Sequence, residues 1–452
     1  MRLRLYATSG LSVLLLSTGC VSERHGYRAV QDALRERVGT GVEWRRIDTD
    51  AKHDEKVQAL LKAPLTPTSA VQLSLLTNFD VQAKLETLRA AQAKLMQSTT
   101  PENPELEGSL GFRRRSPTNV ELSATLELTN LLFLPSAYRA AEADFDAESL
   151  AVAGELVDFV FQTKRAFARA QAAARDAELL QEIVLGERAQ VESARALHTA
   201  GNLNDLDLLT FEAATREAEV SLDLARQNAL SLREALTVQL GLWGRDVNYR
   251  MAPASEPEAE RPSVDHLVTR AFDRSLDLRL AKLRILGASQ GLDVTRARGI
   301  VPKLHGGVKA EREDNLWRAG PMLKLELPIF DHGQAETAVK ESELYQQQRA
   351  YQSLGVKLRS NARAIGTRFL SARTTLTRYD QDLLPMRKKI LEETLLHYNV
   401  MGVDVFQLLA AKSSETKAAQ ARSEALANYE LARIDVEQLL AGRLPPSSQL
   451  HD

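Results

Sequence analysis

The sequence has little of several things on which common classes of protein depend. Cys20 is its only cysteine, which excludes a disulfide within the chain and a cluster of cysteine ligands. The formal net charge is -2, so there is no charge excess to favour nucleic acid as a partner. Aromatic residues are only 5% of the chain, whereas Ala, Leu, Glu, Arg and Gln dominate its middle, a balance typical of extended helices.

Motifs for catalysis are also missing. The sequence contains no glycine-rich phosphate-binding loop and no paired-histidine metalloprotease motif. We therefore expect no enzymatic activity, no metal site, and no cofactor other than a covalent lipid. Beyond the N-terminal segment, the sequence lacks the roughly 18 consecutive apolar residues of a membrane helix, so any membrane crossing would have to use strands.

Residues 1–19 have the features of a secretion signal. Arg2 and Arg4 precede a largely apolar stretch, and "LLSTGC" closes the segment at Cys20. This ending resembles the cleavage box of bacterial lipoproteins, in which the cysteine receives a lipid. Val21 in place of Asp implies, by the same resemblance, sorting to the outer membrane of a Gram-negative bacterium. The alternative is an ordinary signal peptide with an incidental cysteine.

Four segments alternate between apolar and polar residues, which predicts strands with two different faces. They form two predicted β-hairpins, over residues 105–130 and 302–328. Each run has about 10 residues, enough for a tilted strand to cross a bilayer. The alternative is a soluble amphipathic sheet. The charged residues expected on the polar face are Glu121, Glu127, Lys303, Lys309, Lys324 and Glu326.

Two long helical hairpins are predicted, over residues 136–240 and 334–440. The first has a break at "AGNLND" and ends at Gly241, and the second has a break at "MGVD". Pro385 lies inside the outgoing helix of the second hairpin and predicts a kink there. An outgoing helix of this kind would be about 100 Å long, too long for a globular domain.

The two halves of the chain are related by an internal duplication. A shift of 197 places Phe133 on Phe330, and a shift of 200 places Leu208 on Leu408. Each repeat reads helix, strand, strand, long helix, returning helix. The predicted parts are a signal peptide (1–19), a lipidated extension (20–66), a first repeat (67–242), a linker (243–263), a second repeat (264–442) and a tail (443–452).

The segment "LPIFDHGQA" resembles the "P-[LI]-F-D-x-G" signature of TolC-like outer-membrane efflux proteins through Pro328, Phe330, Asp331 and Gly333. The duplication and the helix breaks fit the same family over nearly all of residues 65–442. The first repeat departs from the signature, because "NLLFLPSAYRA" keeps Phe133 but lacks the Asp. Four strands are too few for a membrane barrel, of which the smallest have about 8, so several copies must share one.

The resemblance implies a mainly α protein with transmembrane β structure: a homotrimer whose twelve-stranded β-barrel continues into a periplasmic α-helical tunnel. The four signature residues would then form the barrel-to-tunnel junction, where Pro328 cannot donate to a strand ladder and Gly333 relaxes the bend. The implied function is the outer-membrane channel of a tripartite efflux system, an exit duct for small solutes such as drugs or metal ions.

The implied partners are a periplasmic adaptor, an inner-membrane pump of the resistance-nodulation-division type, and outer-membrane lipid. Two alternatives remain open at this point: a periplasmic adaptor protein, which also has long helical hairpins and can be lipidated, and an exit duct for type I protein secretion. The sequence does not identify the solute.

The resemblance also places the two helix breaks at the periplasmic entrance of the tunnel. Asp404 falls where the family has an acidic ring, Asp205 is its counterpart within one position, and Gln407 replaces a second acidic residue. The alternative role for both Asp residues is capping of the helices that follow. His198 and His397, a few residues before the breaks, suggest a belt of imidazoles that titrates or binds metal, against the alternative of solvated surface histidines.

We predict that Cys20 is acylated. Replacing Cys20 with Ala should lower retention in the outer membrane without abolishing assembly, because the strands would still insert. Mass spectrometry of the mature N-terminus and membrane fractionation measure the two effects; an unmodified N-terminus in the unmutated protein would contradict the prediction.

Overall fold

A computed structural model describes residues 25–44, 50–113, 116–253, 263–313 and 316–446. The predicted signal peptide, Cys20 and residues 254–262 of the predicted linker lie outside these ranges. Contacts divide the chain into two units. Within the described ranges, we call residues 25–30, 85–152 and 280–350 the sheet unit, and residues 31–84, 153–279 and 351–446 the hairpin unit.

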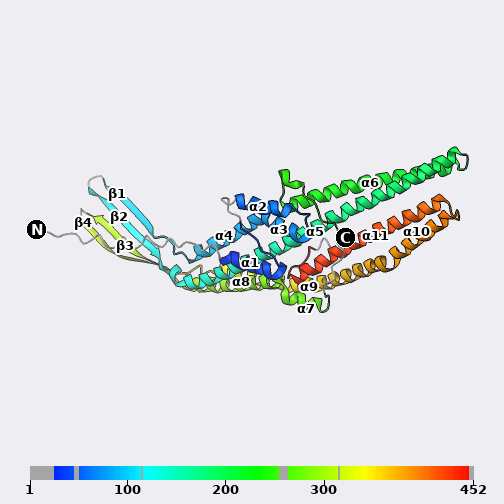
Figure 1. The fold of residues 1–452 in the computed structure, drawn as a ribbon. Helices are drawn as coiled ribbons and strands as arrows, with labels where there is room; N and C mark the ends of the chain where they lie inside the picture. The colour runs from blue at the N-terminus through cyan, green and yellow to red at the C-terminus, as the bar shows by residue number, and fades with distance from the viewer. Residues whose placement is uncertain (1–24, 45–49, 114–115, 254–262, 314–315, 447–452) are drawn as a thin grey trace. The chain divides into compact units, whose positions relative to one another are not determined.

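The elements follow in chain order and are labelled in Figure 1. The first repeat and the segment before it contain α1 (His25–Val38), α2 (Asp50–Leu61), α3 (Pro67–Thr77), α4 (Phe79–Thr99), β1 (Glu105–Arg113), β2 (Ser116–Glu127), α5 (Leu128–Thr199), α6 (Asp205–Leu240) and a short 3-10 turn at Gly244–Val247. The second contains α7 (Leu267–Arg274), α8 (Leu276–Ile300), β3 (Lys303–Glu313), β4 (Leu316–Glu326), α9 (Gln334–Arg378), a π-turn (Tyr379–Leu383), α10 (Leu384–Asn399) and α11 (Val405–Leu440).

The four strands form one antiparallel sheet in the order β1-β2-β3-β4 (Figure 1). Both predicted hairpins are present, and they join through β2 and β3, where Leu122 faces Ala310. Alternation with a period of two gives the sheet one apolar and one polar face. The apolar face is largely uncovered, with Leu106 83% and Leu323 71% exposed. The outer edges of the sheet are β1 and β4.

The passage from strand to helix differs between the repeats. We predicted that the first long helix begins at Ser136, but α5 begins at Leu128, directly after β2, and contains Pro135. The hydroxyl group of Thr129 explains the early start, since it donates to the carbonyl of Pro302 at 3.1 Å and accepts from the N–H of Leu304 at 2.6 Å. This contact fastens the first turn of α5 to the start of β3.

In the hairpin unit, α6 returns alongside α5 and α11 returns alongside α10 (Figure 1). The single helix predicted before each strand pair is two helices, α3 and α4 in one repeat and α7 and α8 in the other. Each returning helix ends at the joint between them: Thr77 donates to the carbonyl of Leu240 at 2.5 Å, and the N–H of Leu276 donates to the carbonyl of Gly442 at 2.9 Å. Each repeat also has its own apolar core, around Phe167 in the first and Phe369 in the second.

The second outgoing helix is interrupted by the π-turn just before Pro385. A proline cannot donate a backbone hydrogen bond and its ring collides with the preceding turn, so a local widening of the helix lets the chain continue. The carboxylate of Asp380 in this turn accepts from Arg422 of α11 at 2.6 Å. The described helices include none that is both long enough and apolar enough to cross a membrane.

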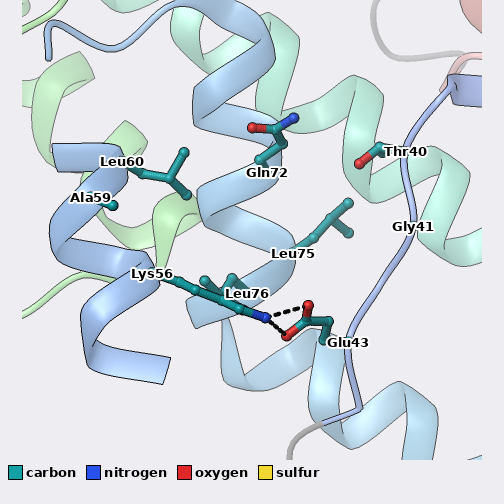
Figure 2. A pocket seen from close by; sticks show the side chains of 9 residues that line it. All are labelled: Thr40, Gly41, Glu43, Lys56, Ala59, Leu60, Gln72, Leu75 and Leu76. Carbon is teal, nitrogen blue, oxygen red and sulfur yellow. Dashed lines mark hydrogen bonds and ion pairs between the residues drawn. The ribbon is translucent and has the colours of Figure 1, made fainter. Parts of the chain in front are cut away.

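A small cavity of about 320 Å³ lies between residues 40–43, α2 and α3 (Figure 2). Leu60, Leu75 and Leu76 line it, and the ammonium group of Lys56 meets the carboxylate of Glu43 at 2.6 Å beside it. None of the site residues predicted from the sequence lies in this cavity.

A buried cluster of charges joins the two repeats in the hairpin unit. Asp435 of α11 and Arg165 of α5 are each only 3% exposed at the side chain. The carboxylate of Asp435 accepts from Arg165 at 2.7 Å and from Arg368 of α9 at 2.6 Å. Gln438 accepts a further hydrogen bond from Arg165. Two cations on different helices therefore share one buried anion.

We predict that Asp435→Ala lowers the free energy of unfolding by about 3–5 kcal/mol, because Arg165 would be left as a buried charge without a partner. Urea unfolding of the purified protein, followed by circular dichroism, measures the change. A matched control is Glu178→Ala, which breaks an exposed pair with Arg175 and should cost less than about 1 kcal/mol. Equal losses in the two variants would contradict the prediction.

Candidate functional site

The polar face of the sheet carries charges that pair across neighbouring strands. Lys309 of β3 meets Glu121 of β2 at 2.6 Å and Glu311 of its own strand at 3.5 Å. On β4, Lys324 meets Glu326 at 3.2 Å. The charges of both signs that the sequence placed on this face are therefore brought together there, with pairs linking β2 to β3 and along β4.

Large apolar side chains are exposed on the apolar face near the hairpin turns and in the segments that flank the other ends of the strands. Phe112 and Trp317 lie near the two hairpin turns and are 83% and 56% exposed. Beyond the opposite ends of the strands, Leu132 of α5, Ile300 at the end of α8 and Phe330 in the turn after β4 are 71%, 80% and 91% exposed. A sheet with one charged and one broadly apolar face suits a boundary between water and lipid, with aromatic rings at the rim.

The signature residues form a compact turn between β4 and α9. β4 ends at Glu326, so Pro328 follows the strand rather than closing it. The carboxylate of Asp331 accepts from the N–H of Gly333 at 2.9 Å, an Asx-type turn. Gly333 has φ 74°, in the left-handed region that a glycine adopts without strain. The backbone thus makes a local turn within a few residues and enters α9.

The tip of the first hairpin is closed by Asn204 and Gly201. Asn204 is the N-cap of α6, and its side chain accepts from the N–H of Asp207 at 2.8 Å. Gly201 has φ 75°. Asp205 is therefore not the cap of this helix, contrary to the capping alternative. Its carboxylate, 90% exposed, lies 2.6 Å from the Nε2 atom of His198.

The tip of the second hairpin repeats this geometry with different residues. Asp404 is the N-cap of α11 and accepts from the N–H of Gln407 at 2.8 Å. Met401 has φ 58°, a left-handed conformation that is unfavourable for a side chain other than glycine. Asp404 and Gln407 also line an open hollow of about 700 Å³ at this tip. Asp404 thus caps α11 and also presents its carboxylate at the tip.

Backbone hydrogen bonds show which residues of the two tips correspond: each residue of the first tip matches the residue 200 positions later in the second. The N–H of Asn202 donates to the carbonyl of Leu197, and the N–H of Gly402 donates to that of His397, both at 2.8 Å. His397 is therefore equivalent to Leu197, and the two histidines do not occupy matching positions. The belt of imidazoles was predicted because both histidines lie a few residues before a helix break, and it stays a prediction.

Two features of the tips were missed by sequence reasoning. Phe211 of α6 and Phe406 of α11 stack with ring centroids 4.9 Å apart and link the two hairpins near their tips. Asn204 was also overlooked as a cap, although a shift of 200 would have aligned it with Asp404. No group of three or more His, Cys, Asp or Glu side chains is placed to hold a metal ion among the residues that the structure describes.

Comparisons with known proteins agree with these features. Residues 70–242 match the family model described as "Outer membrane efflux protein". The cobalt-zinc-cadmium resistance protein CzcC of Cupriavidus metallidurans is 24% identical over 371 residues, which cover 77% of this chain and 83% of that protein.

Solved structures share the fold. The CmeC outer membrane channel of Campylobacter jejuni matches with a TM-score of 0.65 at 15% identity, over 85% of this chain and 88% of that one. The MtrE outer membrane channel of Neisseria gonorrhoeae, solved in its open state, matches with a TM-score of 0.64 at 17% identity, over 84% and 89%. The predicted fold class is thereby confirmed: the chain has the fold of these outer-membrane channels, and its similarity to the efflux family model and to a metal-resistance protein supports the predicted role as the outer-membrane channel of an efflux system.

Proposed function

We propose that the chain works as a homotrimer, anchored in the outer membrane by a lipid on Cys20, and forms the exit duct for divalent metal cations. Its partners in this proposal are a periplasmic adaptor and an inner-membrane pump of the resistance-nodulation-division type. The two-faced sheet carries the proposal, because a charged face needs water and an apolar face needs lipid. Three copies supply twelve strands, enough to close such a sheet.

The choice of metal cations rests on the relative whose name includes cobalt, zinc and cadmium resistance. The chain itself supplies a compatible entrance. Asp205 and Asp404 lie at the two hairpin tips, and Asp205 is 90% exposed at the side chain. Three copies would gather these carboxylates at one end of the duct, where they attract cations and repel one another.

A host strain that lacks the gene tests the function. It should accumulate more Zn²⁺, Co²⁺ or Cd²⁺ and grow less well in their presence, and the intact gene should restore both. Detergents and hydrophobic antibiotics serve as the comparison. A strain that becomes sensitive to these compounds and not to the metals would overturn the choice of metal cations and leave the duct itself in place.

We predict that Asp205→Asn with Asp404→Asn reduces the preference for cations in planar-bilayer recordings without destabilising the tips. Asn keeps the capping hydrogen bond of Asp404 and removes only its charge, as Asn204 does in the other repeat. Asp404→Ala is the matched variant, because it removes both the charge and the capping hydrogen bond, and it should also lower the free energy of unfolding by about 1 kcal/mol. Unchanged ion selectivity in the double Asn variant would leave capping as the role of Asp404.

A further inference from the structure

The two hairpin tips present their carboxylates differently. At the first tip, the Nε2 atom of His198 in the last turn of α5 lies 2.6 Å from the Oδ1 atom of Asp205, the first residue of α6. At a shift of 200, Tyr398 and Val405 take the places of these two residues in the second tip. The carboxylate of the second tip belongs to Asp404, which forms no ion pair among the residues that the structure describes. The first tip thus pairs its carboxylate with a group that changes charge near neutral pH, and the second does not.

We propose that, in the trimeric duct on which this inference rests, His198 controls the ion selectivity of the entrance through Asp205, so that acidification lowers the preference for cations. A neutral imidazole with its proton on Nε2 donates to the carboxylate and leaves the negative charge in place. A protonated imidazole makes the same hydrogen bond and cancels that charge. Because the hydrogen bond is kept in both states, the tip changes its charge without changing its fold.

The first hairpin supplies further charged groups near this pair. Arg195 lies one turn before His198 on α5 and donates to Glu212 of α6 at 2.7 Å, so its charge is already compensated. Asp207 lies in the first turn of α6 and gives the tip a second carboxylate. Protonation of His198 therefore places a cation among carboxylates and cancels one of the two aspartate charges at this tip.

The adjacent hairpin contributes Asp404 and His397. The stacked rings of Phe211 and Phe406 hold α6 beside α11 near the tips, and Asp404 lies two residues before Phe406. His397 lies in the last turn of α10 and forms no ion pair in the described part of the chain. Its protonation would add a charge that no carboxylate contacts and that solvent screens, so we expect the pH response to follow His198.

Planar-bilayer recordings of the purified protein in a gradient of KCl test this role through the permeability ratio of K⁺ to Cl⁻. We expect the ratio of the unmutated channel to fall about twofold from about pH 7.5 to about pH 5.5, a range that spans the titration of an imidazole, because fixed charge at an entrance sets the local concentration of each ion. His198→Gln should keep the high ratio at both pH values, since its amide N–H donates to Asp205 but carries no charge. His198→Lys should keep the low ratio at both.

His397→Gln is the matched control, because it makes the same substitution at the other tip and should keep the pH response. A response that persists in His198→Gln, or one that also disappears in His397→Gln, would overturn this inference alone and leave the cation preference of the duct in place. Unmutated channels without a cation preference at about pH 7.5 would overturn it together with the proposed role of the aspartates at the entrance. A chain that forms no conducting pore would overturn the proposed duct as well.

Discussion

The packing of the two repeats against each other depends on one buried carboxylate. Asp435 accepts from Arg165 of the first repeat and from Arg368 of the second, so the outgoing helix of one repeat and both helices of the other meet at a single anion. Further polar contacts follow α5 along α11: Asp176 accepts from Gln420 at 2.8 Å, and Asp158 accepts from Gln438 at 2.8 Å. Polar partners of this kind fix the register of two long helices more strictly than apolar contacts, which tolerate sliding.

The ends of the two returning helices are also held by a small number of polar contacts. Both returning helices end on the joint between the two helices that open their own repeat, although the atoms differ: a threonine hydroxyl group in the first repeat and a backbone N–H in the second. Arg443, just beyond α11, then pairs with Asp158 and Asp277. Burial raises the pKa of Asp277 against the opposing effect of Arg443, so this carboxylate depends on its cation to stay ionised.

Much of the architecture could be predicted from the sequence because its signals are local. Alternation with a period of two marks both hairpins, and glycine or polar breaks mark both tips. The start of α5 could not be predicted, because Pro135 argues locally for a later start and the contact of Thr129 with β3 is not local. The cap at the first tip was ambiguous for another reason: Asn204 and Asp205 are adjacent, and both residue types cap helices well. Only the backbone hydrogen bonds resolve which position each occupies, and they also separate His198 from His397.

The π-turn at Tyr379–Leu383 bears on how the two halves diverged. The offset between them is 197 residues at Phe133 and Phe330 but 200 at Leu208 and Leu408, so the second half has three more residues over this stretch. A π-turn holds one residue more than an α-turn, and it therefore absorbs a single inserted residue without unwinding the helix on either side. One of the three additional residues can therefore be confined to a single turn, where it does not rotate the distal segment of the helix that leads to the tip.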